Sequence, residues 1–384
     1  MIGAVNGLTA RWAATVEGGT VFSAAGVWPL LAFLADGATG AAREELAEAL
    51  GVPAEQAGAA ARELLATMAG IDGLDSALGL WTKRFVELRE EWAAELPAEA
   101  HGVLTGELDA DQESLDAWAA KRTGGAIERM SVTLEPDSSL VLATALALRT
   151  DWEVPFTGTL VPWRGQERAG LSRTVPDPDT VTVARTSAGA VTEARVQGVD
   201  GIDVHLLLGD EGLGPRQVLG VGVDILSGAA STVPGGRLPI GEAGPGLRVE
   251  RIRTKQPEPP SLTLDTVEFT LDAHHDLLAR PELFGLTTAA DSGPGHFAGI
   301  SPDPLALAAG RQSATATFSA VGFRAAAVTA MDMAWMSWDP EPYESKRAHA
   351  VFDRPFGFLA VHRGTRLVLA AGWVTDPKPS ARTT

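Results

Sequence analysis

Few residues of this 384-residue chain stand at spacings that support catalysis or metal binding. The chain has no Gly-x-Ser-x-Gly motif, and Ser23 precedes an apolar run that is typical of a buried helix. His274 and His275 are adjacent, so on a helix they would point about 100° apart and could not share one metal as an i, i+4 pair does. With no cysteine, there is no thiolate nucleophile and no thiolate metal site. We therefore expect no catalytic residue, cofactor or metal, and a hydrolase that uses Ser23 is the least favoured function.

One segment has a pattern that conflicts with its surroundings. It runs from Ala314 to Trp338, ATATFSAVGFRAAAVTAMDMAWMSW, and read with period two it places its charges on one face. The other face carries Phe323, Ala325, Ala327, Thr329, Met331 and Met333. The run that follows, WDPEPYESKRA, is polar and contains prolines, which is typical of an exposed loop. The segment therefore has the pattern of a buried strand but the context of a loop.

These residues resemble the reactive loop of the serpins. Gly322 and the alanine block after it, followed by Arg354, Pro355 and Phe356 in FDRPFGFLAV, are similar to the hinge, the loop and the closing hairpin of that family. The resemblance implies that the loop is bait for a protease and that, once cut, it inserts as an extra strand into the central sheet. The hinge residues that it implies are Gly322, Phe323, Arg324, Ala325, Ala326, Ala327, Val328 and Thr329.

The scissile bond that the resemblance implies lies between Met336 and Ser337, fourteen residues after Gly322. An unbranched apolar residue before that bond suits a protease with a hydrophobic primary pocket, such as a chymotrypsin-like, elastase-like or subtilisin-like enzyme. Methionines and tryptophans at this spacing could instead fill a core or a groove on a partner. The stretch from this bond to Phe352 looks longer than is usual in the family, so the cut could also lie elsewhere in the loop.

The resemblance covers nearly the whole chain, most strongly from Val21 to Phe156 and from Leu262 onward. Leu140–Leu148, LVLATALAL, is apolar almost throughout, as expected of a strand covered on both faces, and looks like the strand beside which a serpin loop inserts. Leu115–Ile127 resembles the helix that packs across the sheet. Thr144 stands where the family usually has asparagine, and Gln312 stands where it has histidine. The residues that the resemblance assigns to the breach and the shutter, the regions where the sheet opens, are Trp152, Ser23, Thr144 and Gln312.

Periodicity predicts the main elements independently. Apolar residues on every side of a helical wheel predict a buried helix from Val21 to Gly40, and Val86 to Leu96 has the pattern of an amphipathic helix. Leu262 to Phe269 is predicted to form one strand, and FGFLAV and RLVLAAGWV are predicted to form a hairpin joined at His362 to Thr365. The resemblance to the serpins implies the α+β class, with three β-sheets, about eight or nine helices and an exposed loop at about residues 322–350, in one domain over residues 1–384.

Composition narrows the range of partners and compartments. A net charge of −18 argues against nucleic acid and anionic membranes, and no uncharged apolar stretch reaches the ~18 residues of a membrane span. The N-terminus shows no signal peptide, which predicts a cytoplasmic protein as written, or an extracellular one if a leader has been removed. The absence of disulfides is compatible with either redox state. We expect a monomer whose partner is the target protease.

Two residues depart from the serpin pattern and keep a second function open. Phe323 is large where the family favours a small first inward residue, and overpacking of that kind costs about 1 to 3 kcal/mol. Ala320 stands where the family usually has glutamate. The first hypothesis is therefore an irreversible inhibitor of a serine or related protease, and the alternative is a non-inhibitory serpin-fold protein that binds a partner or has a structural role.

Overall fold

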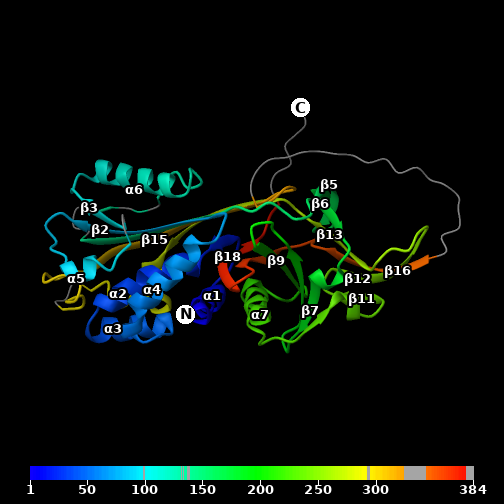
Figure 1. Ribbon diagram of the computed structural model, residues 1–384, viewed down its shortest axis with the longest axis horizontal. Helices are drawn as coiled ribbons and strands as arrows, with labels where there is room; N and C mark the ends of the chain where they lie inside the picture. Colours follow the sequence, from blue (N-terminus) through cyan, green and yellow to red (C-terminus); the bar gives the residue numbers. More distant parts are fainter. Residues whose placement is uncertain are drawn as a thin grey trace.

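The computed structural model of the protein describes residues 1–97, 100–130, 132, 134–135, 139–291, 295–323 and 343–377. Three β-sheets and eight α-helices account for the regular structure of these residues, which confirms the expected α+β class. The molecule is elongated, with the helical layers at one end and a narrow strand-built tip at the other (Figure 1).

The central sheet has five strands and is the one to which the sequence assigned the opening. Its order is β14 (Phe269–Asp276), β15 (Leu307–Phe318), β4 (Leu140–Leu148), β2 (Leu74–Lys83) and β3 (His101–Leu104). Every residue of β4 is buried, as its continuous apolar run predicted. The hydrogen-bonded register places β4 between β2, which is antiparallel to it, and β15, which is parallel to it.

Two further sheets complete the strand layers. The seven-stranded sheet has the order β1 (Thr20–Phe22), β18 (Leu367–Val374), β17 (Phe356–His362), β9 (Ile202–Gly209), β8 (Ala190–Val196), β7 (Val181–Arg185) and β10 (Thr232–Pro234). The six-stranded sheet has the order β11 (Gly241–Gly244), β12 (Leu247–Thr254), β16 (Tyr343–Val351), β13 (Ser261–Thr266), β6 (Gln166–Val175) and β5 (Thr157–Trp163). The predicted hairpin is confirmed as β17 and β18.

The helices cover both faces of the central sheet (Figure 1). They are α1 (Ile2–Ala13), α2 (Ala24–Gly37), α3 (Gly40–Leu50), α4 (Ala54–Ala69), α5 (Glu90–Ala93), α6 (Leu108–Arg122), α7 (Pro215–Ser227) and α8 (Pro281–Phe284), with short 3-10 turns at Pro178–Thr180, Gly235–Arg237 and Leu277–Ala279. Helix α2 is buried along almost its whole length and packs against β2, β4 and β18. On the opposite face, α6 contacts β2, and its Leu115 and Ala119 share an apolar cluster with Ala143 and Ala145 of β4.

Four predicted boundaries are wrong, each because a distant partner determines the structure. Thr20–Phe22 forms β1 on the edge strand β18, so the buried helix begins only after Ser23. The amphipathic helix predicted over Val86 to Leu96 is reduced to α5, whose Trp92 is buried against α2. Leu262 to Phe269 is divided between β13 and β14, which belong to different sheets. The predicted loop range ran to about residue 350, but Tyr343–Val351 form β16.

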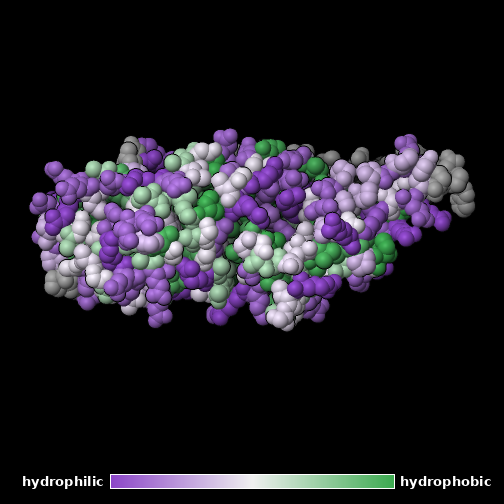
Figure 2. Space-filling view, turned by 60° about the horizontal axis from the view of Figure 1, so that its bottom comes forward, coloured by the Kyte–Doolittle hydropathy of each residue, from purple (hydrophilic) through white to green (hydrophobic). Residues whose placement is uncertain are grey.

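The surface agrees with the acidic, charged composition. Figure 2 shows hydrophilic residues over most of one face, with apolar residues in small separate areas. In the described part of the chain, no helix combines the length and the apolar character that a membrane crossing requires.

Candidate functional site at the opening of the central sheet

The candidate site is the seam between β15 and β4. The parallel register runs from Leu307 opposite Leu140 to Ala314 opposite Leu146, so the two strands are directly paired. Because each strand already has its other edge occupied, by β14 and β2 respectively, this seam is where an added strand would separate two existing neighbours. Insertion would widen the sheet by about 4.8 Å beneath α6.

Three of the predicted opening residues meet in one buried cluster. The side-chain amide of Gln312 on β15 donates to the Ser23 carbonyl oxygen at 2.8 Å and to the Thr144 hydroxyl on β4 at 3.3 Å, while its oxygen accepts from the Ser23 N–H at 2.8 Å. The Ser23 hydroxyl donates to the Leu369 carbonyl oxygen on β18 at 2.6 Å and accepts from the Gly26 N–H. Ser23 is thus the N-cap of α2, and Gln312 links that helix to both strands of the seam.

The same cluster must open if a strand enters the seam. The Gln312 to Thr144 hydrogen bond crosses directly from β15 to β4, and all three side chains are no more than 1% exposed. A buried polar group that loses its partner costs about 1 to 3 kcal/mol, so this cluster opposes separation of the strands until new partners are available.

Trp152 lies beyond one end of the seam, four residues after the last residue of β4. Its indole N–H donates to the Ser319 carbonyl oxygen at 2.9 Å, and its backbone N–H donates to the Val321 carbonyl oxygen at 3.0 Å. Its ring packs 4.9 Å from Phe318 and 6.5 Å from Phe156. The structure therefore does not bring Trp152 to the Ser23, Thr144 and Gln312 cluster; it brings Trp152 to the point where the chain leaves β15.

The first two hinge residues are held against this tryptophan segment. Gly322 forms an antiparallel bridge with Asp151, and a Cβ added to Gly322 would lie 2.4 Å from the Thr150 carbonyl oxygen, so the approach requires glycine. Phe323 donates its N–H to that same oxygen at 2.8 Å, is 2% exposed, and places its ring 6.0 Å from Phe358 of β17. The sequence singled out Phe323 for its size, but its anchoring in the core was not predicted.

The remaining loop predictions cannot be compared with the structure. They fall on Arg324, Ala325, Ala326, Ala327, Val328, Thr329, Met336 and Ser337, which lie outside the described residues. Ala320, the other departure from the serpin pattern, is described: it is 5% exposed, and its carbonyl oxygen accepts from the Phe156 N–H at 2.8 Å.

Comparisons with known proteins agree with this architecture. The family model described as serpin (serine protease inhibitor) matches residues 8–161. A putative serpin-Z6C of Oryza sativa subsp. japonica is 26% identical, over 95% of this chain and 92% of that protein. The native-state crystal structure of tengpin, a thermophilic serpin, superposes with a TM-score of 0.74 at 13% identity, covering 98% of this chain and 94% of tengpin.

Human thyroxine-binding globulin, solved as a complex, superposes with a TM-score of 0.73 at 16% identity over 98% of both chains. The chain has the serpin fold. The resemblance to the serpins that the sequence indicated is therefore confirmed.

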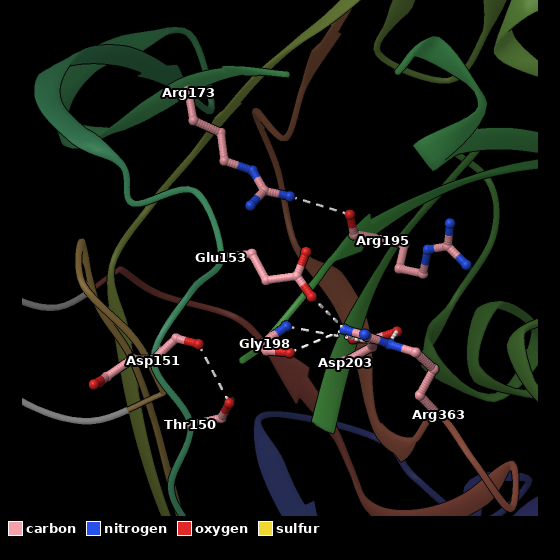
Figure 3. A network of polar contacts seen from close by, with 8 residues as sticks. All are labelled: Thr150, Asp151, Glu153, Arg173, Arg195, Gly198, Asp203 and Arg363. Carbon is pink, nitrogen blue, oxygen red and sulfur yellow. Dashed lines mark hydrogen bonds and ion pairs between the residues drawn. The ribbon is translucent and has the colours of Figure 1, made fainter. Parts of the chain in front are cut away.

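A charged network that the sequence did not predict stabilises the segment that follows β4 and contains Thr150 to Glu153 (Figure 3). Arg363, in the turn after β17, forms hydrogen bonds with the buried Asp203 carboxylate at 2.7 and 3.0 Å, with the Glu153 carboxylate at 3.0 Å and with the Gly198 carbonyl oxygen at 2.9 Å. The hydrogen bond to Asp203 raises the pKa of Arg363 despite partial burial. Arg363 thereby ties the segment that carries Trp152 to β9.

Arg173 of β6 is a second, more deeply buried cation beside this network. It is 6% exposed, donates to the carbonyl oxygens of Val154 at 3.2 Å and Arg195 at 3.1 Å, and lies over the Phe156 ring at 4.9 Å. Burial lowers its pKa to about 10, although the charges of Glu153 and Asp203 act in the other direction. Its contacts position Phe156, which in turn packs on Phe318 at the end of β15.

On the far side of residues 324–342, the chain resumes as β16 in the six-stranded sheet. His349 of β16 lies 2.7 Å from an Asp265 carboxylate oxygen on β13. That hydrogen bond raises the pKa of His349, opposed by its partial burial. Burial acts to raise the pKa of Asp265, but the hydrogen bonds from His349 and Ser172 and the charge of His349 together outweigh it, and the pKa is lowered. The other charges that influence His349 are Glu250 on β12 and Arg347 on β16, and Arg248 of β12 stands opposite it in the register.

We predict that Gln312→Leu lowers the free energy of unfolding by about 2 to 4 kcal/mol, because it leaves the Ser23 backbone groups and the Thr144 hydroxyl without partners in a dry site. Urea unfolding measures the loss, with the exposed Gln166→Leu on β6 as the matched control. A change for Gln312→Leu as small as the roughly 0.5 kcal/mol of ordinary surface substitutions would contradict this role.

We also predict a pH-dependent contribution from His349. Its raised pKa means that the ion pair stabilises the fold below about pH 6.5 and that this contribution is lost as the pH rises through the folded pKa. The lowered pKa of Asp265 means that its contribution is present above about pH 4 and is lost as the pH falls through the folded pKa. The difference in unfolding free energy between wild type and His349→Gln should therefore be largest between about pH 4 and 6.5 and shrink toward pH 9.

Urea unfolding at a series of pH values measures this difference. In the control, His101→Gln, burial lowers the histidine pKa, so that difference should shrink as the pH falls. A difference for His349→Gln that stays constant from pH 5 to 9 would show that the charged pair is not formed.

Proposed function

We propose that this protein is an irreversible inhibitor of a serine or related protease, which it traps by inserting its cleaved loop between β15 and β4. The observation that supports the proposal is the direct pairing of β15 with β4 in the intact chain. A strand-patterned segment leaves the end of β15, while β15 and β4 remain directly paired in a five-stranded sheet. Cleavage within that segment would free it to become a sixth strand.

The driving force would come from the added strand. Each backbone hydrogen bond contributes about 0.5 to 1.5 kcal/mol, and burial of apolar side chains contributes about 25 cal/mol per Å². On the face of β4 toward α6, the side chains of Ala143 and Ala145 are small. The loop carries small residues too, Ala325, Ala326 and Ala327, so an inserted strand would need little room beside β4. Trapping requires this insertion to be faster than hydrolysis of the acyl-enzyme, which is a kinetic competition.

The target that fits is a protease with an apolar primary pocket, because Met336 precedes the proposed scissile bond. On this proposal the hinge is Gly322 to Thr329, and the groups that resist opening are the Gln312 cluster and the contacts of Trp152. The protein would act once per molecule and would not turn over substrate.

The burial of Phe323 supports a second candidate, a serpin-fold protein that binds a partner without trapping proteases. Its ring must leave a core position beside Phe358 before the hinge can enter the seam, which raises the barrier to insertion. A slow hinge would let the protease finish hydrolysis, and the chain would be cut as a substrate. One structural relative is a globulin solved with thyroxine, so the fold also occurs in a protein that binds a small molecule.

Loop cleavage separates the two candidates. We expect proteases with apolar primary pockets to form a complex that survives denaturing electrophoresis, and the cleaved chain to unfold at a markedly higher temperature than the intact chain. Met336→Arg should transfer complex formation to a trypsin-like protease, whereas Met333→Arg, the control, should not. A cleaved chain that melts at the same temperature as the intact one, with no stable complex, would exclude the inhibitor and leave the binding protein.

We further predict that Phe323→Ser increases the fraction of protease trapped per loop cleaved, because a small side chain leaves the core and enters the seam at lower cost. The same change should lower the stability of the uncut chain by about 3 to 5 kcal/mol, the cost of emptying a buried aromatic position. Phe85→Ser, at a phenylalanine that is 71% exposed, is the matched control. A trapped fraction that falls with Phe323→Ser would show that the ring assists insertion.

A further inference from the structure

A positively charged cavity lies at the narrow tip of the molecule, where β12 leads into β13. It is lined by residues 252–258 and by Arg347 of the neighbouring strand β16, and its volume is about 740 Å³. Pockets that hold small molecules have volumes in this range. The charged residues of the lining are Arg253, Lys255 and Arg347 against one carboxylate, Glu258, in a protein whose net charge is −18. In Figure 1 this region carries the labels of β12 and β16.

The carboxylate opposite Arg253 in the sheet is already engaged by another arginine. The antiparallel register of β12 and β16 places Glu344 opposite Arg253. The Glu344 carboxylate, however, lies 3.6 Å from the guanidinium group of Arg251, and within the described residues Arg253 forms no ion pair. Because Arg253 is also exposed, its charge is available to a molecule in the cavity.

Arg347 is in the same situation, and part of its side chain is buried. The register places it opposite Glu250, whose carboxylate oxygen lies 2.8 Å from the Nε of Arg248. The Nε of Arg347 is buried and has no hydrogen-bond partner among the described residues. Buried donors are nearly always hydrogen-bonded in folded proteins, so this one indicates an acceptor that the protein itself does not supply. An oxyanion beside the guanidinium group would supply it.

Two hydrogen bonds fix one wall of the cavity. The Thr254 hydroxyl donates to the Gln256 carbonyl oxygen at 2.6 Å, and the Ser345 hydroxyl of β16 donates to the Pro259 carbonyl oxygen at 3.1 Å. Both hydroxyl-bearing residues are buried. The segment over residues 255–260 is therefore held against the ends of the strands, so the backbone that carries the cations is in place before a ligand binds.

We propose that this cavity binds a compact, multiply charged anion that carries phosphate or sulfate groups. A guanidinium group presents its N–H donors in a planar fork that matches the oxygens of such groups. Two arginines and a lysine together match more than one negative charge. The site uses no residue of the seam or of the hinge, so it does not depend on the proposed function.

A compact anion fits this site better than a long polyanion does. The rest of the surface is strongly acidic, so it would repel an extended chain of negative charges that leaves the cavity. Charges farther than about 8 Å from a bound molecule are largely screened at physiological salt. A molecule small enough to stay within the cavity therefore interacts mainly with the local cations.

Isothermal titration calorimetry with two compact ring anions tests the site at about 0.15 M salt. Inositol hexakisphosphate represents the phosphate source, sucrose octasulfate represents the sulfate source, and uncharged myo-inositol is the control ligand. We expect at least one of the two anions to bind and myo-inositol not to bind.

Four variants locate the bound anion. Arg253→Gln and Arg347→Gln should each weaken binding at least about tenfold, because each removes a charge-assisted hydrogen bond. Glu258→Gln should strengthen binding at least about threefold, because it removes a negative charge from the lining. Arg84→Gln, at an exposed arginine just beyond β2, is the matched control and should bind as wild type does.

Binding of only one probe would identify phosphate or sulfate as the ligand chemistry and would support the site. If neither probe binds, the site is overturned. Equal affinities for Arg253→Gln and Arg84→Gln would also overturn it, because net charge alone would then explain the binding. Arg253 is exposed, so this comparison holds even where Arg347→Gln fails to fold. The proposed inhibition stands or fails separately, on the result of loop cleavage.

Discussion

The parallel pairing of β15 with β4 is the constraint on which the rest of the structure depends. Among the described residues, it joins β14 and β15 to β4, β2 and β3 in one five-stranded sheet, and β4 is buried on both faces. A strand added at this seam must first break the hydrogen bonds between β15 and β4 and then form new hydrogen bonds with both strands. On the proposed function, the inserted state would be favoured by the extra hydrogen bonds, although the path to it begins with the loss of those between β15 and β4. The native arrangement can therefore persist for kinetic reasons.

Different groups oppose the separation of β15 from β4 at different positions along the seam. In the middle, the Gln312 amide spans the seam and also holds the cap of α2. At the top, Trp152 and Phe323 join the tryptophan segment to the chain that leaves β15, and Arg363 ties the same segment to β9. Because these groups share backbone neighbours, their effects on strand separation are expected to be coupled and not additive.

The sequence predicted this seam better than it predicted its surroundings. LVLATALAL identified β4 with its observed bounds because a continuous apolar run has few alternatives. The resemblance named Trp152, Ser23, Thr144 and Gln312, but it did not predict that the last three form one hydrogen-bonded cluster. The short strand β1 was read as the start of a helix, since only pairing with β18 makes it a strand. The Arg363 network was missed because Asp203 and Glu153 come from elements far apart in the sequence, and no local pattern records such contacts. For the same reason, no local pattern indicated the pairing of β11 with β12, which lie between Phe156 and Leu262, where the resemblance is weakest.

Phe323 shows why a residue type alone could not decide the function. As a sequence position it is an oversized side chain in a series of alanines, which suggests a defect in insertion. In the structure it is a satisfied core residue whose N–H and ring both have partners. Its size therefore acts on the uncut state as well as on the inserted one. If the Phe323 ring is buried in both the uncut and the inserted form, its size changes the free-energy difference between the two forms less than it changes the barrier to insertion. On the proposed function, whether this chain traps its protease or is cut as a substrate would depend on how quickly the Phe323 ring leaves its position beside Phe358.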